Sequence, residues 1–216
     1  MRRESRTTEA LKCELLPVIF KILSLIVGFD LNLRLLFNLL MSSNYHLRRM
    51  DREIKNVKIL RKILEKTTHI ALAMANMDEP YIVPLNHYYN AEENCIYFHG
   101  AGVGKQIEFM KRNPLVWGLA VIDHGFGEGQ CENLYASVVF SGHVTFLEDK
   151  EARIIVLKRQ IVKESGDKEA MLKRLDTASA SPGFSNTLVC RLDIESMTGK
   201  RSTLWTEDVL LNMLEK

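Results

Sequence analysis

The segment Gly100–Lys105, with the sequence GAGVGK, carries residue types that can bind a phosphate group. Glycine lets backbone N–H groups approach an anion, and Lys105 at the start of an expected helix adds a positive charge. The spacing differs from that of a nucleotide P-loop, because only three residues separate Gly100 from Gly104 and Gln106 replaces the hydroxyl residue that holds magnesium. Taken alone, the segment fits a phosphate site and a tight turn into a helix equally well.

The six histidines offer a second kind of chemistry, proton transfer or metal binding. No two of them stand at the i, i+4 spacing that a zinc site on a helix uses, so no metal is expected. His87 and His99 fall on neighbouring expected strands and can lie close together, although a strand histidine is more often a surface or core residue. Cys131 has no nucleophile signature and is interpreted as a loop thiol.

Hydrophobic periodicity and turn residues predict the elements that position these groups. A helical period follows Asp51, the expected N-cap, and Asp149 is expected to cap a later helix. Gly142 interrupts a long strand pattern and predicts a β-bulge or a sharp bend. The expected strands are 68–76, 80–90, 95–100, 114–123, 132–149 and 186–197, and the expected helices are 51–66, 105–112, 149–162 and 168–175.

About six strands without a regular strand–helix alternation disfavour a doubly wound parallel sheet. We therefore expect a mainly β fold, a small and mostly antiparallel barrel with peripheral helices. Aromatic residues in the strands can pack a barrel or a dimer surface, or they can wall a flat aromatic cofactor. These residues are Tyr81, Tyr88, Tyr89, Tyr97, Phe98 and Trp117.

Composition narrows the class of protein. The chain has 216 residues, of which 46% are hydrophobic and 26% charged, as is typical of one globular domain with an appendage. Its net charge of +2 lacks the basic excess of nucleic-acid-binding proteins, so no nucleic acid partner is expected. The four cysteines lie far apart without a Cys-x-x-Cys pair, which indicates reduced thiols and a cytoplasmic protein.

Residues 1–47 are expected to form an apolar and basic helical extension with no part in the chemistry. Lys21, Asp30 and Arg34 divide the apolar residues 15–40 into charge-free runs shorter than the roughly 18 residues that a spanning helix needs. Three readings stay open: a helix packed on the body, an amphipathic helix that contacts a membrane surface, and a segment upstream of the native start. We favour an extension packed on the body.

Several motifs in a fixed order resemble one protein family. They are RRMDREI, YIVPLNH, IYFHGAGVGK, YASVVFSG and a terminal strand that ends in TGK, and they span about Arg48 to Ser202. This order is similar to that of the FMN-binding split-barrel superfamily related to pyridoxamine 5'-phosphate oxidase, and more closely to its nitroimidazole-resistance branch. The resemblance implies a homodimer of six-stranded antiparallel split β-barrels, with an FMN in each groove between the subunits.

The resemblance also implies roles for individual residues. The expected cofactor-binding residues are Val83, Pro84, Leu85, Asn86, His99, Lys105 and Lys200. The first four run along the isoalloxazine ring, His99 and Lys105 approach the ribityl phosphate, and Lys200 is a basic position near the closing strand. His87 matches a histidine close to the flavin and is the candidate catalytic residue, which positions the substrate or donates a proton.

These implications lead to the hypothesis of an FMN-dependent oxidoreductase that takes electrons from NAD(P)H or another donor and reduces a nitroaromatic or quinone-like small molecule. Vitamin B6 oxidation is not expected, because Val103-Gly104-Lys105 replaces a Ser-Arg-Lys-like run of the oxidase proper. FAD or haem stays open as the cofactor, and a non-catalytic flavin- or haem-binding protein is the alternative function. The domain is expected to span 48–202, followed by a helical tail at 203–216.

Overall fold

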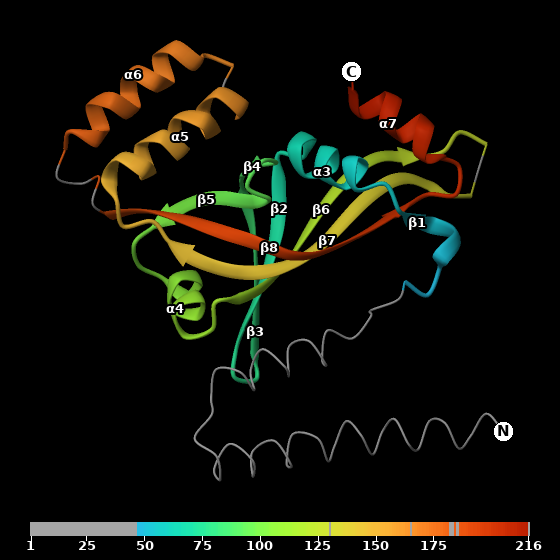
Figure 1. Cartoon of the computed structure of the whole chain (residues 1–216), viewed down its shortest axis with the longest axis horizontal. Coiled ribbons are helices and arrows are strands. Elements are labelled where there is room, and N and C mark those ends of the chain that lie inside the picture. The colour runs from blue at the N-terminus through green and yellow to red at the C-terminus, as the bar shows by residue number, and fades with distance from the viewer. Residues whose placement is uncertain (1–46, 130, 165, 182–183, 185, 216) are drawn as a thin grey trace, which may run out of the picture. The chain divides into compact units, whose positions relative to one another are not determined.

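A computed structural model describes residues 47–215, apart from residues 130, 165, 182, 183 and 185 (Figure 1). Residues 49–216 form one compact unit. Residues 1–46 of the expected extension, and with them the expected membrane contact of residues 15–40, lie outside the described residues. Among the helices that are described, none has both the length and the apolar character needed to cross a membrane.

The described part of the chain contains eight strands, five α-helices and one short 3-10 helix. The bounds of the helix after Gly104 match the expected residues 105–112, because Gly104 precedes this helix and Asn113-Pro114 follows it. In chain order the elements are η1 (Met50–Arg52), β1 (Glu53–Ile54), α3 (Val57–Lys66), β2 (His69–Asn76), β3 (Glu79–Asn86), β4 (Tyr88–Asn90), β5 (Cys95–Ala101), α4 (Lys105–Arg112), β6 (Leu115–Phe126), β7 (Asn133–Phe146), α5 (Lys150–Glu164), α6 (Lys168–Ser179), β8 (Thr187–Arg201) and α7 (Glu207–Glu215).

All eight strands belong to one antiparallel sheet (Figure 1). The strand order is β3-β2-β6-β7-β8-β5-β4, and β1 pairs with β8. The mainly β fold with peripheral helices is confirmed. The expected six-stranded barrel is wrong in strand number and in closure, since no ladder among the described residues joins β3 to β4. The additional strands are β1 and β4, which have two and three residues and are too short to show a periodic sequence pattern.

A bulge lies at the expected position beside Gly142, but the extra residue, Glu195, belongs to β8 and not to β7. The register between β7 and β8 shifts between Ser141 and Gly142, so that the two strands change their pairing at this point. A Cβ atom at position 142 would lie 1.9 Å from the carbonyl oxygen of Asp193 on β8. Only glycine therefore permits the close approach of the two backbones that the bulge requires.

The expected N-cap at Asp51 is wrong. Asp51 lies in η1 and forms an ion pair with Arg49, and α3 begins six residues later at Val57. Its N-cap is Asn56, whose side chain accepts a hydrogen bond of 2.9 Å from the backbone N–H of Lys58. The residues between these points pair with the end of β8, and this pairing holds them in an extended conformation.

The helices α3 and α7 lie on the same side of the sheet and cover its core (Figure 1). Ile59 and Ile63 of α3 are fully buried at the i, i+4 spacing, and Leu210 and Leu214 of α7 repeat this spacing against them. The helices α5 and α6 form a separate pair near β5 and the start of β8. A second, smaller apolar cluster packs under α5.

Apolar side chains are exposed on one face of β6 and on the strands beside it. Alternate residues of β6 from Leu115 to Val121 have exposed fractions of 39–48%, while those between them are mostly buried. The register places Leu119 beside Val139 of β7 and joins Trp117 through β2 to Ile82 of β3. We call this the β6 surface, and its apolar residues are Ile82, Leu115, Trp117, Leu119, Val121 and Val139.

Candidate functional site

The segment Val83–Asn86, expected to run along a flavin ring, lies on the edge strand β3. Within the described chain β3 pairs only with β2, so every second residue of β3 directs its backbone N–H and C=O groups away from the sheet. Pro80 and Pro84 both lie on this strand, as is usual for an edge. The outer edge of the strand therefore offers unpaired carbonyl acceptors, but Pro80 and Pro84 supply no N–H donor there.

Lys105 lies beside the beginning of the same strand. It is the first residue of α4, and Gly104 before it has a φ of 125°, in the left-handed region that favours glycine. The ammonium group of Lys105 contacts Glu79 Oε1 at 2.5 Å and lies 5.0 Å from the centre of the Tyr81 ring. The structure therefore places a cation and a helix N-terminus beside the start of the strand that contains Val83.

His99 and Asn86 are connected through α5. His99 Nδ1 donates to Gln160 Oε1 at 2.9 Å, and Gln160 Nε2 donates to Glu164 Oε1 at 3.3 Å. The other oxygen of Glu164 accepts from Asn86 Nδ2 at 3.2 Å. His99 of β5 and Asn86 of β3, two of the expected cofactor residues, are thus linked by hydrogen bonds through two side chains of α5.

A cavity of about 570 Å³ opens beside this chain of hydrogen bonds, between α5, α6 and the paired ends of β5 and β8. Its size lies in the range of small-molecule sites. Its wall is mostly apolar, with a few polar groups from both helices. The lining residues are His99, Leu157, Gln160, Ile161, Glu164, Met171, Arg174, Leu175, Ala178, Phe184 and Thr187.

His87, the expected catalytic residue, is buried with no exposed surface. Its Nε2 donates to the carbonyl oxygen of Leu64 at 2.7 Å, and Lys163 donates to the carbonyl oxygens of His87 and Thr67, each at 3.1 Å. The carbonyls of Leu64 and Thr67 lie at the C-terminal end of α3, where helical carbonyls lack partners within the helix. His87 and Lys163 therefore cap α3.

The same surroundings determine the protonation of His87. Burial, followed by the positive charge of Lys163, lowers the pKa of His87 to about 4. Burial also lowers the pKa of the Lys163 ammonium group. At neutral pH the His87 ring is therefore uncharged and donates its single N–H to Leu64. Its role toward a substrate stays a prediction.

Lys200 lies far from His99 within one chain. Val189 of β8 pairs with His99, and Lys200 follows it after a run of about 36 Å along the strand. Lys200 instead pairs with Ser137, which pairs in turn with Val121 of β6. It therefore borders the β6 surface.

The α5 residues of the candidate site were not predicted. Gln160 is buried on the same helix face as Val156 and Leu157, where the helical period calls for an apolar residue. A buried amide needs hydrogen-bond partners, and Gln160 finds them in His99 and Glu164. A polar residue at an apolar position of a helix was the signal that could have identified this part of the site.

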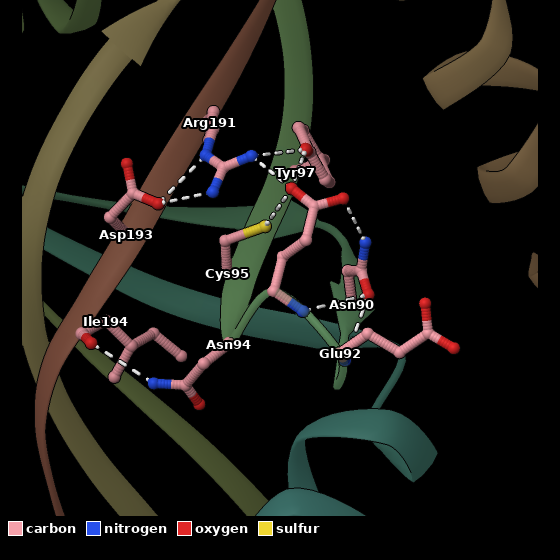
Figure 2. Close-up of polar contacts among 9 residues, drawn as sticks. Asn90, Glu92, Asn94, Cys95, Tyr97, Arg191, Asp193 and Ile194 are labelled. Atoms are coloured by element: carbon pink, nitrogen blue, oxygen red, sulfur yellow. Dashed lines mark hydrogen bonds and ion pairs between the residues drawn. The ribbon is translucent and has the colours of Figure 1, made fainter.

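A second polar cluster lies at the other end of β5 (Figure 2). Arg191 of β8 donates to Asp193 Oδ1 at 2.8 Å, to the Tyr97 hydroxyl at 3.0 Å and to the carboxylate of Glu93. Tyr97 in turn donates to Glu93 at 3.2 Å. Hydrogen bonding from Arg191 lowers the pKa of Glu93, whereas burial raises the pKa values of Tyr97 and Cys95. The polar groups of this cluster are thus paired with one another through hydrogen bonds and ion pairs.

The three cysteines that the structure describes add no evident nucleophile to either cluster. Cys95 and Cys190 are buried, and burial raises the pKa of both thiols, that of Cys190 to about 12. Cys131 is exposed in the loop between β6 and β7. In the part of the chain that the structure describes, no group of three or more His, Cys, Asp or Glu side chains is arranged to hold a metal ion.

Solved structures of other proteins share this fold. A candidate 5-nitroimidazole antibiotic resistance protein from Bacteroides thetaiotaomicron is 24% identical, with a TM-score of 0.58 over 68% of this chain and 85% of that one. An FAD-binding protein from Mesorhizobium loti is 22% identical, with a TM-score of 0.50 over 70% and 97% of the two chains. A flavocytochrome from Azotobacter vinelandii is 15% identical, with a TM-score of 0.60 over 79% and 80%.

The family itself follows from the sequence match. No curated protein matches the chain. The family model described as pyridoxamine 5'-phosphate oxidase matches residues 57–201, which is well over half of the chain and includes β3, β5, α4 and β8. The resemblance inferred from the order of motifs is thereby confirmed, and two of the three solved structures are of proteins named for a flavin or for FAD. The chain belongs to the pyridoxamine 5'-phosphate oxidase family.

Proposed function

We propose that the protein is an FMN-dependent oxidoreductase that reduces a nitroaromatic or quinone-like small molecule with electrons from NAD(P)H or another donor. The observation that carries this proposal is the position of Lys105 and the α4 N-terminus at one end of the edge strand β3. A flavin mononucleotide has a flat ring with several hydrogen-bonding atoms on one edge and a phosphate at the end of a chain. The edge of β3 corresponds to the ring, and Lys105 with the N-terminus of α4 corresponds to the phosphate.

The phosphate fits the N-terminus of α4. Free backbone N–H groups at a helix N-terminus and a lysine both favour a dianion. Lys105 now pairs with Glu79, and both side chains are about half exposed, so Glu79 can turn to solvent when a phosphate binds. A surface ion pair of this kind is worth only about 0–1 kcal/mol, so its loss does not prevent binding.

The ring fits the outer edge of β3. The carbonyl group of Pro84 and the N–H and C=O groups of Asn86 can pair with the polar edge of the ring, while Ile82 and Pro84 offer apolar contact. Bound FMN supplies the redox chemistry, and the chain places the ring and excludes water from one of its faces. Oxidation of vitamin B6 is not part of the proposal, because the phosphate-binding run differs from that of the oxidase proper.

We propose further that two copies of the chain associate through the β6 surface. A contiguous apolar patch of this kind on a soluble domain marks an interaction site. Lys200 borders this surface, so association would carry it to the interface although it lies far from His99 within one chain. Trp117→Glu should convert the dimer to a monomer in analytical ultracentrifugation, whereas Leu204→Glu, at an equally exposed site outside the surface, should leave it dimeric.

The test of the cofactor begins with the visible absorbance spectrum of protein purified from a flavin-replete host. Flavin bands that bleach on anaerobic addition of NADH or NADPH would support a reductase. Lys105→Gln should weaken FMN binding about tenfold or more, because a charge-assisted contact to phosphate is lost, while Lys111→Gln in the last turn of the same helix should not. A colourless protein that takes up no FMN would contradict the assignment.

The alternative function is a non-catalytic protein that stores or senses a flavin or haem. One observation favours it: His87, the expected proton donor, is buried and uncharged at neutral pH. Flavin bands that persist after anaerobic addition of NADH and NADPH, although dithionite bleaches them, would support a binder. Steady turnover of NAD(P)H by the flavin-loaded protein would exclude it.

A further inference from the structure

The two helices around the cavity present matching sets of side chains to it. Each set has the i, i+3, i+4, i+7 spacing that places residues on one helix face. The α5 set is Leu157, Gln160, Ile161 and Glu164, and the α6 set is Met171, Arg174, Leu175 and Ala178. The faces of both helices are thus turned toward one space, as they would be in a helix pair with a packed interface.

The space between these faces is hollow rather than packed. None of the twelve residues of α6 is buried, and Met171 is 37% exposed although it belongs to the face turned toward α5. The apolar wall is completed by Phe184 and by Leu157, which are themselves buried. A cavity of about 570 Å³ with such a wall is large enough for a flat bicyclic molecule.

The two charged side chains of the cavity, Glu164 and Arg174, differ in whether they already have hydrogen-bond partners. Glu164 already accepts hydrogen bonds at both oxygens, from Gln160 and from Asn86. Arg174 takes part in no ion pair or hydrogen bond among the residues that the structure describes, and its planar guanidinium can bind a carboxylate with two parallel hydrogen bonds. The unused charge at the cavity is therefore positive.

We propose that the α5–α6 cavity is a binding site for an amphipathic organic anion, with an apolar aromatic body between the helices and one carboxylate on Arg174. This cavity lies beside the flavin site proposed at β3 and Lys105, to which Glu164 connects it through Asn86, but Arg174 and α6 have no part in that site, so its occupation does not require a flavin. His99 and Gln160 form its polar floor, where a second polar group of the ligand can bind.

The test uses 2-naphthoate as the probe and the neutral 2-naphthylmethanol as its matched control, titrated calorimetrically into the full chain. Naphthoate should bind saturably, at least about tenfold more tightly than the alcohol, because only the anion gains the contact to Arg174. Arg174→Gln should remove this difference by weakening naphthoate alone. Ala178→Phe, which fills the cavity from α6, should weaken both compounds.

Lys173→Gln supplies the control for charge, because it removes a positive charge from the adjacent residue, which does not line the cavity. Naphthoate affinity should not change in this variant. Equal weakening by Lys173→Gln and Arg174→Gln, or no saturable binding to the unmodified chain, would overturn the proposal. Mutual displacement of FMN and naphthoate would overturn the separation of the two sites. If FMN fails to bind while naphthoate binds as described, the proposed function falls and the cavity proposal stands.

Discussion

The two ends of β5 differ in how their polar groups are satisfied. At its beginning, Tyr97 belongs to the cluster around Arg191, in which each charged group contacts an opposite charge or a hydroxyl (Figure 2). At its end, His99 faces a cavity whose only arginine, Arg174, has no ion-pair partner in the described chain. The same pair of strands, β5 and β8, carries both ends.

This difference indicates that one end of β5 contributes mainly to the stability of the fold and the other mainly to ligand binding. Polar groups that satisfy one another hold strands in register, and they offer little to a ligand because a ligand would have to replace existing contacts. Polar groups beside a cavity contribute little to the stability of the fold and remain able to form hydrogen bonds or ion pairs with a ligand. We call the Tyr97 end of β5 the closed end and the His99 end the open end. We expect substitutions at the closed end to change the free energy of unfolding and substitutions at the open end to change ligand affinity.

The largest effect is expected at the bulge that sets the register of the closed end. Gly142→Ala places a Cβ 1.9 Å from the carbonyl oxygen of Asp193, a member of the Arg191 cluster, and this oxygen belongs to the backbone and cannot rotate away. We expect a loss of about 3 kcal/mol or more in the free energy of unfolding, measured by urea denaturation.

Gly100→Ala is the matched control, because Gly100 lies at the open end of β5 and a Cβ there meets no atom within 4 Å. Its free energy of unfolding should stay within about 0.5 kcal/mol of the original. Equal stability of the two variants would mean that the bulge does not fix the register and that the closed end is no more rigid than the open one.

The next largest effect concerns pH and the buried His87. Its pKa is about 4 in the folded chain and about 6.5 when exposed, so between these values the unfolded chain binds a proton that the folded chain does not. Stability is therefore highest above pH 6.5 and falls as the pH decreases toward 4. From pH 7 to pH 5 the loss from this residue should be about 2 kcal/mol.

His87→Gln keeps a donor for Leu64 and removes the titration, so its unfolding free energy should vary much less between pH 7 and pH 5. His69→Gln changes an exposed neighbour that contributes least to the lowered pKa of His87, so it should retain most of the slope. The same slope in all three proteins would show that His87 is not the buried neutral ring described above, and would return it to the candidate proton donors.

The sequence predicted those parts of the molecule that depend on local signals. Gly104 and the Asn113-Pro114 pair mark the two ends of α4, and Gly142 marks the bulge, because each of these residues permits or forbids a backbone conformation by itself. The start of α3 was missed because the residues before it are held by β8, a distant part of the chain. Local helix signals cannot report such pairing.

The candidate site was predicted only in part for the same reason. The resemblance implied that Lys105 and Val83–Asn86 bind one cofactor, and the structure has Lys105 in contact with Glu79 at the start of β3, while the cofactor roles stay predictions. The contacts of His99 and Asn86 with α5 depend on how this helix packs after folding, and although Gln160 at an apolar position marks a buried polar contact, it does not identify the partners. His87 is the last residue of the motif YIVPLNH, and the motif did not reveal that this histidine caps α3.

The smallest effect compares one arginine at each end of β5. Arg191→Met leaves Glu93 and Asp193 without their cation, but both carboxylates are 43–49% exposed and are screened by water. We expect a loss of about 1–2 kcal/mol in the free energy of unfolding, measured by urea denaturation at neutral pH.

Arg174→Met makes the same substitution at the open end, where the described structure contains no carboxylate partner for the guanidinium, so the free energy of unfolding should change by less than about 0.5 kcal/mol. High salt should reduce the loss in Arg191→Met, because it weakens ion pairs at exposed carboxylates, and should leave Arg174→Met unchanged. If Arg174→Met instead destabilises the chain as much as Arg191→Met does, then Arg174 is already satisfied by the fold, and the open end of β5 is closed by a contact that leaves no charge free for a ligand.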